Sequence, residues 1–127
     1  MSHTYSNSQK LFERASQVIA GGVNSGIRKM EEPVPLFFSH GKGCRLWDAD
    51  NNETIDFQAG QGAMLYGHGC EGMATAMYEQ ALRGTHFAAQ TQLEIDVAER
   101  LCAMIPGADL VRFNNSATEV VNSAFRL

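Results

Sequence analysis

The chain has 127 residues, of which 44% are hydrophobic and 19% are charged. Its length is that of one domain, which argues against a disordered tail and against a large multidomain enzyme within this chain. Ten Lys and Arg against 14 Asp and Glu give a net charge of −4, without the basic excess of nucleic-acid binders. The apolar runs are far shorter than the ~20 residues of a membrane span, and the first residues lack a signal-peptide pattern. We therefore expect a soluble, cytoplasmic protein with no nucleic-acid or membrane partner.

The first half of the sequence predicts a helix followed by a small antiparallel sheet. Apolar residues recur at helical spacing over residues 6–19, with a capping-box pattern of Ser6 and Gln9 at the start and Gly21-Gly22 at the end. Beyond a loop at residues 23–29, short apolar segments alternate with turns rich in Gly, Asp and Asn. These segments predict a meander with strands at residues 36–38, 44–47 and 54–57 and turns at residues 40–43 and 48–52.

The second half changes to small residues and then to helices. Residues 58–63 carry no bulky side chain, so the backbone can approach a neighbouring group closely. Helical spacing of apolar residues follows at residues 71–82 and again at residues 92–104. Residues 110–113 then predict a strand, and Ser116 begins a last helix. A strand followed by a helix is the start of an α/β unit whose second strand is missing, so we expect an α/β fold.

The start of the last helix is the most suggestive local feature. A strand there delivers Ser116 and Thr118 to a helix N-terminus, where free N–H groups, hydroxyls and the helix dipole attract an anion such as phosphate. Ser116 with Glu119 three residues later is equally an ordinary capping box. The residues alone leave both interpretations open.

Other candidate sites are weaker. Asp48, Asp50 and Asn52 resemble the opening of a calcium loop, but the sixth position is Glu53 and the twelfth is Ala59, where such a loop needs Gly and Glu. The His and Cys residues have no second pair at metal-ligand spacing, and the three cysteines read as reduced thiols. We therefore predict no metal site.

The charged residues supply one candidate ligand and no catalytic group. Arg28 stands in a loop rich in Gly and Asn, where a guanidinium could clamp a substrate carboxylate. Lys10, Lys29 and Lys42 lack the apolar surroundings that depress the pKa of an amine for Schiff-base chemistry. We accordingly assign no catalytic residue.

Several motifs in a fixed order carry a family resemblance. They resemble the N-terminal part of the class III aminotransferases, pyridoxal-phosphate enzymes of fold type I, and within them most closely the glutamate-1-semialdehyde 2,1-aminomutases. The matching segments are Leu11-Phe12-Glu13-Arg14-Ala15, Gly21-Gly22-Val23-Asn24-Ser25 with Arg28, residues 43–50, Ile55-Asp56-Phe57, Gly67-His68, and Val111-Arg112-Phe113 running into residues 115–119. The resemblance implies an N-terminal helix and meander at residues 1–65 and the incomplete beginning of the cofactor-binding large domain at residues 66–127.

The resemblance also implies roles for individual residues. Ser116, Ala117 and Thr118 match the family's Ser-Gly-Thr, which gives N–H and hydroxyl donors to the phosphate of pyridoxal 5'-phosphate. Arg28 matches the arginine that pairs with the substrate carboxylate, and Gln61 stands where the aminomutases have a tryptophan beside the substrate. The implied reaction moves an amino group on an amino-acid or semialdehyde substrate through aldimine intermediates, in a homodimer.

The departures from the family pattern concern the substrate and the catalytic lysine. Gly26 replaces a proline in the loop that presents Arg28, and Gln61-Gly62-Ala63 replaces Trp-Gly-Pro, so a transaminase of another amino acid, such as a β-amino acid, is an alternative. None of the lysines matches the family's Schiff-base lysine, which lies beyond the point of Leu127. We expect the chain to be a piece of such an enzyme that is inactive alone. A truncated, non-catalytic remnant with a structural or interaction role is the alternative.

Overall fold

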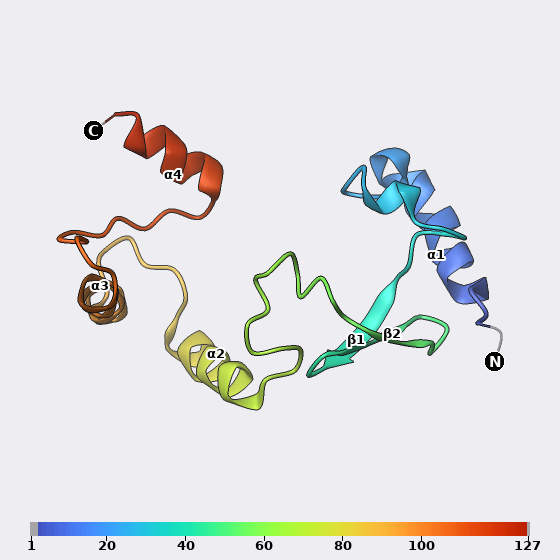
Figure 1. The fold of residues 1–127 in the computed structure, drawn as a ribbon, viewed down its shortest axis with the longest axis horizontal. Coiled ribbons are helices and arrows are strands. Elements are labelled where there is room, and N and C mark those ends of the chain that lie inside the picture. The colour runs from blue at the N-terminus through green and yellow to red at the C-terminus, as the bar shows by residue number, and fades with distance from the viewer. Residues whose placement is uncertain (1–2, 127) are drawn as a thin grey trace. The chain divides into compact units, whose positions relative to one another are not determined.

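The computed structural model describes residues 3–126 and divides after residue 80 into two compact units. The first unit contains helix α1 and a three-stranded sheet, coloured blue to green in Figure 1. The second unit contains helices α3 and α4, coloured orange to red. Helix α2, Glu71–Arg83, crosses the division.

Helix α1, Ser6–Val18, is capped by a residue far along the chain. The N-cap position is Tyr5, whose side chain makes no capping bond, so the predicted capping box of Ser6 and Gln9 is wrong. Instead the Asp50 carboxylate accepts hydrogen bonds from the backbone N–H groups of Asn7 (2.8 Å) and Ser8 (2.9 Å). A carboxylate at a helix N-terminus satisfies free N–H groups and complements the helix dipole. Asp50 thereby ties α1 to the sheet.

The sheet is the predicted antiparallel meander, in the order β1-β2-β3. The strands are β1, Phe38–Lys42, β2, Arg45–Asp48, and β3, Glu53–Ile55. The prediction misplaced the first turn, because β1 runs through residues 40–42 and the chain reverses at Gly43 and Cys44. Gly43 has a φ of 57°, a left-handed conformation that glycine adopts without strain. The first strand accordingly begins at Phe38 and not at Leu36.

The second turn owes its shape to Asp48. This residue is 3% exposed, and its carboxylate accepts bonds from the N–H groups of Asp50 (2.9 Å) and Asn52 (2.8 Å) and from the Asn52 side chain (2.8 Å). Side-chain to backbone bonds of this kind define turns. The pattern of Asp48, Asp50 and Asn52 therefore serves a turn and a helix cap. In the described part of the chain, no three or more His, Cys, Asp or Glu residues are placed to hold a metal ion.

The later helices lie where the sequence predicts them. Helix α3 spans Gln92–Met104, with a capping box of Thr91 and Glu94, and helix α4 spans Ala117–Ala124. The predicted strand at residues 110–113 is absent from the structure. A strand exists by pairing with another strand, and none of the described residues pairs with this segment.

Little of the chain's apolar surface is buried. Ala15 and Val34 are the buried apolar residues among those described. The apolar faces of α2, α3 and α4 are open, with Met77, Leu93 and Val121 more than half exposed. Within residues 3–126, no helix combines the length and apolar character needed to cross a membrane.

Candidate functional site

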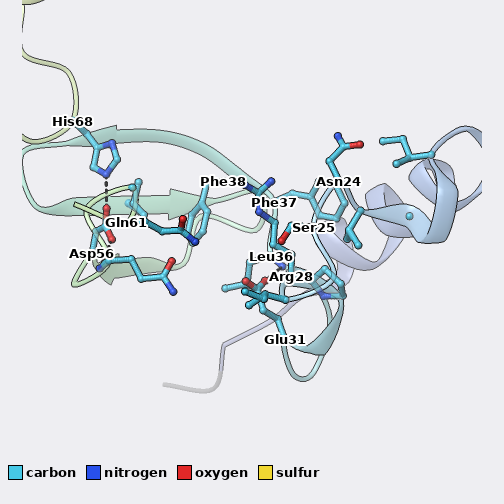
Figure 2. Close-up of a pocket in the computed structure, with 18 residues that line it drawn as sticks. Asn24, Ser25, Arg28, Glu31, Leu36, Phe37, Phe38, Asp56, Gln61 and His68 are labelled. Carbon is cyan, nitrogen blue, oxygen red and sulfur yellow. Dashed lines mark hydrogen bonds and ion pairs between the residues drawn. The ribbon is translucent and has the colours of Figure 1, made fainter. Parts of the chain in front are cut away.

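The first unit contains a cleft of about 760 Å³. Figure 2 shows Asp56, Gln61 and His68 at one end of this cleft, with Arg28 and Glu31 apart from them near Leu36. The cleft is lined by residues from three segments: the loop at residues 19–31, the segment at residues 35–38 with Leu46, and the loop at residues 56–68. Both residues that the sequence assigns to the substrate, Arg28 and Gln61, therefore line one cleft.

Arg28 begins a short 3₁₀ helix, Arg28–Met30, and its side chain is exposed. The turn before it is fixed by a backbone bond from the Arg28 N–H to the Ser25 carbonyl (3.1 Å). The neighbouring carboxylate of Glu31 is engaged by the N–H of Leu36 (3.0 Å). Among the described residues nothing bonds to the Arg28 guanidinium, which leaves its donors available for a carboxylate ligand.

Gln61 stands in a glycine-rich loop with an unusual backbone. Its φ is 59° and that of Ala59 is 45°, left-handed values that are uncommon for residues other than glycine. Bonds within the loop, from Gly62 N–H to the Gln58 carbonyl (3.1 Å) and from Met64 N–H to the Ala59 carbonyl (2.9 Å), hold this shape. Strained backbone of this kind persists where the surrounding structure determines it, often at functional sites.

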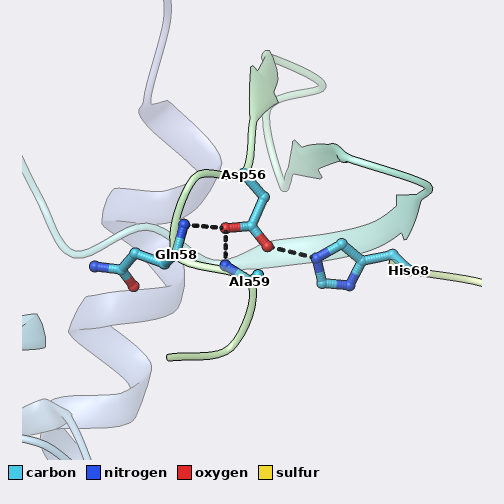
Figure 3. A network of polar contacts seen from close by, with 4 residues as sticks. All are labelled: Asp56, Gln58, Ala59 and His68. Atoms are coloured by element: carbon cyan, nitrogen blue, oxygen red, sulfur yellow. Dashed lines mark hydrogen bonds and ion pairs between the residues drawn. The ribbon is translucent and has the colours of Figure 1, made fainter. Parts of the chain in front are cut away.

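Asp56 and His68 form the tightest polar contact lining the cleft. His68 Nε2 lies 2.6 Å from Asp56 Oδ2, and the other carboxylate oxygen accepts the N–H groups of Gln58 and Ala59, each at 2.9 Å (Figure 3). The hydrogen bond from His68, followed by that from the Ala59 N–H, holds the pKa of the Asp56 carboxyl below its ordinary value. Asp56 is therefore a carboxylate at neutral pH.

The phosphate-binding candidates belong to the second unit. Ser116 is the N-cap of α4. Its hydroxyl accepts the Glu119 N–H (3.3 Å) and donates to the Glu119 carboxylate (3.2 Å). Half of the capping box inferred from the sequence is thus present, because the Glu119 carboxylate accepts the N–H of Asn115 (3.0 Å) and not that of the N-cap residue Ser116. The N–H groups of Ala117 and Thr118 and the Thr118 hydroxyl have no partner among the described residues. A helix N-terminus with free donors suits a phosphate, so these residues fit the phosphate group of the implied cofactor.

Sequence reasoning did not assign Asp56, His68 or Glu31 to the site. The sequence gives His68 no partner at metal-ligand spacing, and the structure bonds its ring to Asp56. The signal lay in the sequence, since Ile55-Asp56-Phe57 and Gly67-His68 are two of the motifs that carry the family resemblance. The three cysteines are free thiols, as expected.

Comparison with known proteins decides the family. The profile of the aminotransferase class-III family matches residues 27–127. The chain belongs to the class III aminotransferases. This confirms the resemblance seen in the sequence, and with it pyridoxal 5'-phosphate as the cofactor of the family.

Curated relatives include glutamate-1-semialdehyde 2,1-aminomutases. The chain is 40% identical over 122 residues to a glutamate-1-semialdehyde 2,1-aminomutase of Sulfurihydrogenibium sp. and 42% identical over 125 residues to one of Chloroflexus aggregans. These alignments cover 94% and 97% of this chain and 28% of each relative. The chain thus spans little more than a quarter of the length of the relatives it matches.

Solved structures with a similar fold include transaminases. An omega-transaminase from Sphaerobacter thermophilus matches with a TM-score of 0.88 and 34% identity, over 98% of this chain and 29% of that one. A β-phenylalanine aminotransferase from Variovorax paradoxus matches with a TM-score of 0.86 and 31% identity, over 94% of this chain and 27% of that one. The expected fold, the N-terminal portion of a fold type I enzyme, is confirmed.

Proposed function

We propose that this chain forms part of a pyridoxal-phosphate-dependent aminotransferase or aminomutase, in which it binds the substrate carboxylate and the cofactor phosphate. The observation that carries the proposal is the cleft of the first unit, which Arg28 and Gln61 both line. Family membership of residues 27–127 supports the same function.

Arg28 is proposed to bind and orient the substrate. Its planar guanidinium can donate two parallel hydrogen bonds to a carboxylate, which fixes the direction of the substrate as well as its position. The Arg28 side chain is exposed in the cleft and makes no internal ion pair among the described residues, so binding a substrate breaks no such contact.

Ser116, Ala117 and Thr118 are proposed to hold the cofactor phosphate. The free N–H groups of Ala117 and Thr118 and the positive end of α4 supply donors and charge, while the Ser116 hydroxyl also caps the helix. The bound cofactor supplies the electron sink for moving a proton at the substrate carbon that carries the amino group. Catalytic residues are not assigned within this chain.

The substrate is an amino acid or an amino-acid semialdehyde. Gln61 places an amide where the aminomutases have an aromatic side chain, which favours a substrate other than that of the aminomutases. The β-phenylalanine aminotransferase among the structural relatives makes a β-amino acid the second candidate. The family resemblance further suggests a homodimer in the cytoplasm.

The test is replacement of Arg28 in the complete protein that contains this chain. A charge-assisted hydrogen bond contributes roughly 1.5–3 kcal/mol, so Arg28→Gln should raise KM for the amino-acid substrate by about tenfold to a hundredfold. Lys29→Gln removes the adjacent cation, which does not line the cleft, and should leave KM unchanged. Steady-state kinetics with L-glutamate, L-alanine and β-phenylalanine as amino donors measure this. An equal effect of the two variants, or none for Arg28→Gln, would contradict the proposed role.

A further inference from the structure

The loop that carries Gln61 is closed at both ends by the same turn of the sheet. We define this Gln61 loop as residues 57–67, flanked by Asp56 and His68. The Asp56 N–H donates to the Cys44 carbonyl (2.8 Å), and His68 exchanges two backbone bonds with Gly43, each of 2.8 Å. Both ends of the loop are therefore anchored on the turn between β1 and β2.

A side-chain bond joins the same two ends directly. His68 Nε2 donates to Asp56 Oδ2 over 2.6 Å, and the Asp56 side chain is 8% exposed. The remaining Asp56 oxygen caps the N–H groups of Gln58 and Ala59, the first turn of the loop (Figure 3). One carboxylate thus fixes the start of the Gln61 loop and, through His68, its end.

Two glycines allow the close backbone approach that this arrangement needs. A Cβ at Gly67 would lie 2.7 Å from the Gly43 carbonyl oxygen, and a Cβ at Gly41 would lie 2.7 Å from the His68 Cβ. Such distances are far inside van der Waals contact. Small residues at these positions let the loop end and the His68 ring lie directly against the sheet.

We propose that Asp56 and His68 are positioning residues for substrate recognition. They hold the Gln61 loop so that Gln61 faces the cleft that Arg28 also lines. The left-handed backbone at Ala59 and Gln61 is what the pair maintains, because these conformations are strained for residues with a Cβ. The inference rests on the proposed function where it assigns the cleft to the substrate.

The consequence concerns binding more than turnover. If the link is removed, the loop loses its side-chain closure while the backbone bonds to Gly43 and Cys44 remain, so Gln61 samples positions outside the cleft. Loss of contacts made equally to substrate and transition state raises KM and leaves kcat nearly unchanged. A role in folding alone would instead lower the amount of active protein and reduce the apparent kcat.

The experiment compares His68→Ala, His68→Gln and His40→Ala in the complete protein. Glutamine can still donate a hydrogen bond toward Asp56, whereas alanine cannot. His40→Ala is the matched control, because His40 stacks on Trp47 at a centroid distance of 4.8 Å and does not line the cleft. Amide hydrogen exchange of residues 57–67 reports the loop, and kinetics with L-glutamate, L-alanine and β-phenylalanine report the cleft.

We expect His68→Ala to speed exchange in residues 57–67 and to raise KM about tenfold, with kcat within twofold of the wild type. His68→Gln should restore much of both losses, and His40→Ala should change neither. Unaltered loop exchange in His68→Ala, or faster exchange with an unchanged KM, would overturn the inference. If the wild-type protein transfers no amino group from any donor, the proposed function fails, and hydrogen exchange alone then decides whether the pair holds the loop.

Discussion

Besides Asp48, two further carboxylates of the sheet region accept hydrogen bonds from backbone N–H groups. Asp50 caps α1 from more than forty positions away in sequence, and Asp56 caps the first turn of the Gln61 loop. The role of Asp50 is not visible in local sequence, because the cap of a helix is normally sought within its first residues. Only the packing of α1 against the turn after β2 brings Asp50 to the free N–H groups.

The Asp50 cap predicts a pH-dependent stability of α1. Burial acts to raise the pKa of the Asp50 carboxyl, but the bonds from the Asn7 and Ser8 N–H groups help to bring it below its ordinary value of 3.8. A lowered folded-state pKa means that the stabilisation is complete above pH 3.8 and is lost as the pH falls through the folded-state value. Asp50→Asn should therefore weaken α1 at neutral pH and resemble the wild type in acid.

Amide hydrogen exchange of residues 6–18 in the complete protein measures this. The protection lost in Asp50→Asn should be largest near pH 6 and should shrink below about pH 4, as the wild-type carboxyl is protonated. Asp96→Asn, on the exposed surface of α3, is the control and should leave residues 6–18 unaffected. A difference between wild type and Asp50→Asn that stays constant over this pH range would rule out the carboxylate cap.

At the scale of elements, helices were predicted well and strand boundaries were not. The helices at residues 71–82 and 92–104 have periodic apolar faces and glycine or capping signals at their ends. The strand predicted at residues 110–113 failed because pairing, which no local pattern contains, decides whether an apolar segment is a strand. The first turn lies at Gly43 and Cys44, and not at residues 40–43 as predicted, because His40 pairs with Trp47 and Lys42 pairs with Arg45.

Part of the candidate site was predictable from the sequence, and the part that depends on long-range contacts was not. Arg28 and Gln61 were found by their positions in family motifs, and the cleft brings them together. The bond between Asp56 and His68 depends on the path of the loop between them, which composition does not specify. Two motifs of unexplained purpose, Ile55-Asp56-Phe57 and Gly67-His68, become one structural unit only in three dimensions.

The Gln61 loop predicts a contrast between two glycines with left-handed backbone. Gly62, at a φ of 90°, has open space around a built Cβ, so Gly62→Ala should cost only the backbone strain, about 1–2 kcal/mol. Gly67, at a φ of 72°, would place a Cβ 2.7 Å from the Gly43 carbonyl oxygen, and Gly67→Ala should cost about 1–3 kcal/mol more. Thermal unfolding of the complete protein measures both, and equal losses would contradict the close packing of the loop end on the sheet.

At the scale of the whole chain, the dominant feature is the large amount of apolar surface that is exposed to solvent. Among the described residues Phe57, Leu65 and Leu110 are 93%, 87% and 93% exposed. Exposed apolar surface on this scale marks faces that other protein segments cover, or a tendency to aggregate. The relatives are more than three times as long as this chain, and their additional residues are the natural candidates for that cover.

We therefore expect the isolated 127-residue chain to be poorly packed. It should bind the dye ANS strongly and should unfold without a cooperative transition, because little apolar surface is buried to oppose chain entropy. Fluorescence of ANS and calorimetry on the purified chain measure this. A monomer with a single sharp unfolding transition would contradict the expectation.

The central claim is that this chain belongs to an enzyme that uses pyridoxal phosphate to move an amino group, and the direct measurement is chemical trapping of the cofactor. The complete protein is treated with borohydride, which fixes the cofactor covalently to its lysine, and the labelled peptide is located by mass spectrometry. We predict one pyridoxyl group per subunit of the complete protein, on a lysine other than Lys10, Lys29 and Lys42. A complete, folded protein that carries no pyridoxyl group would contradict the claim.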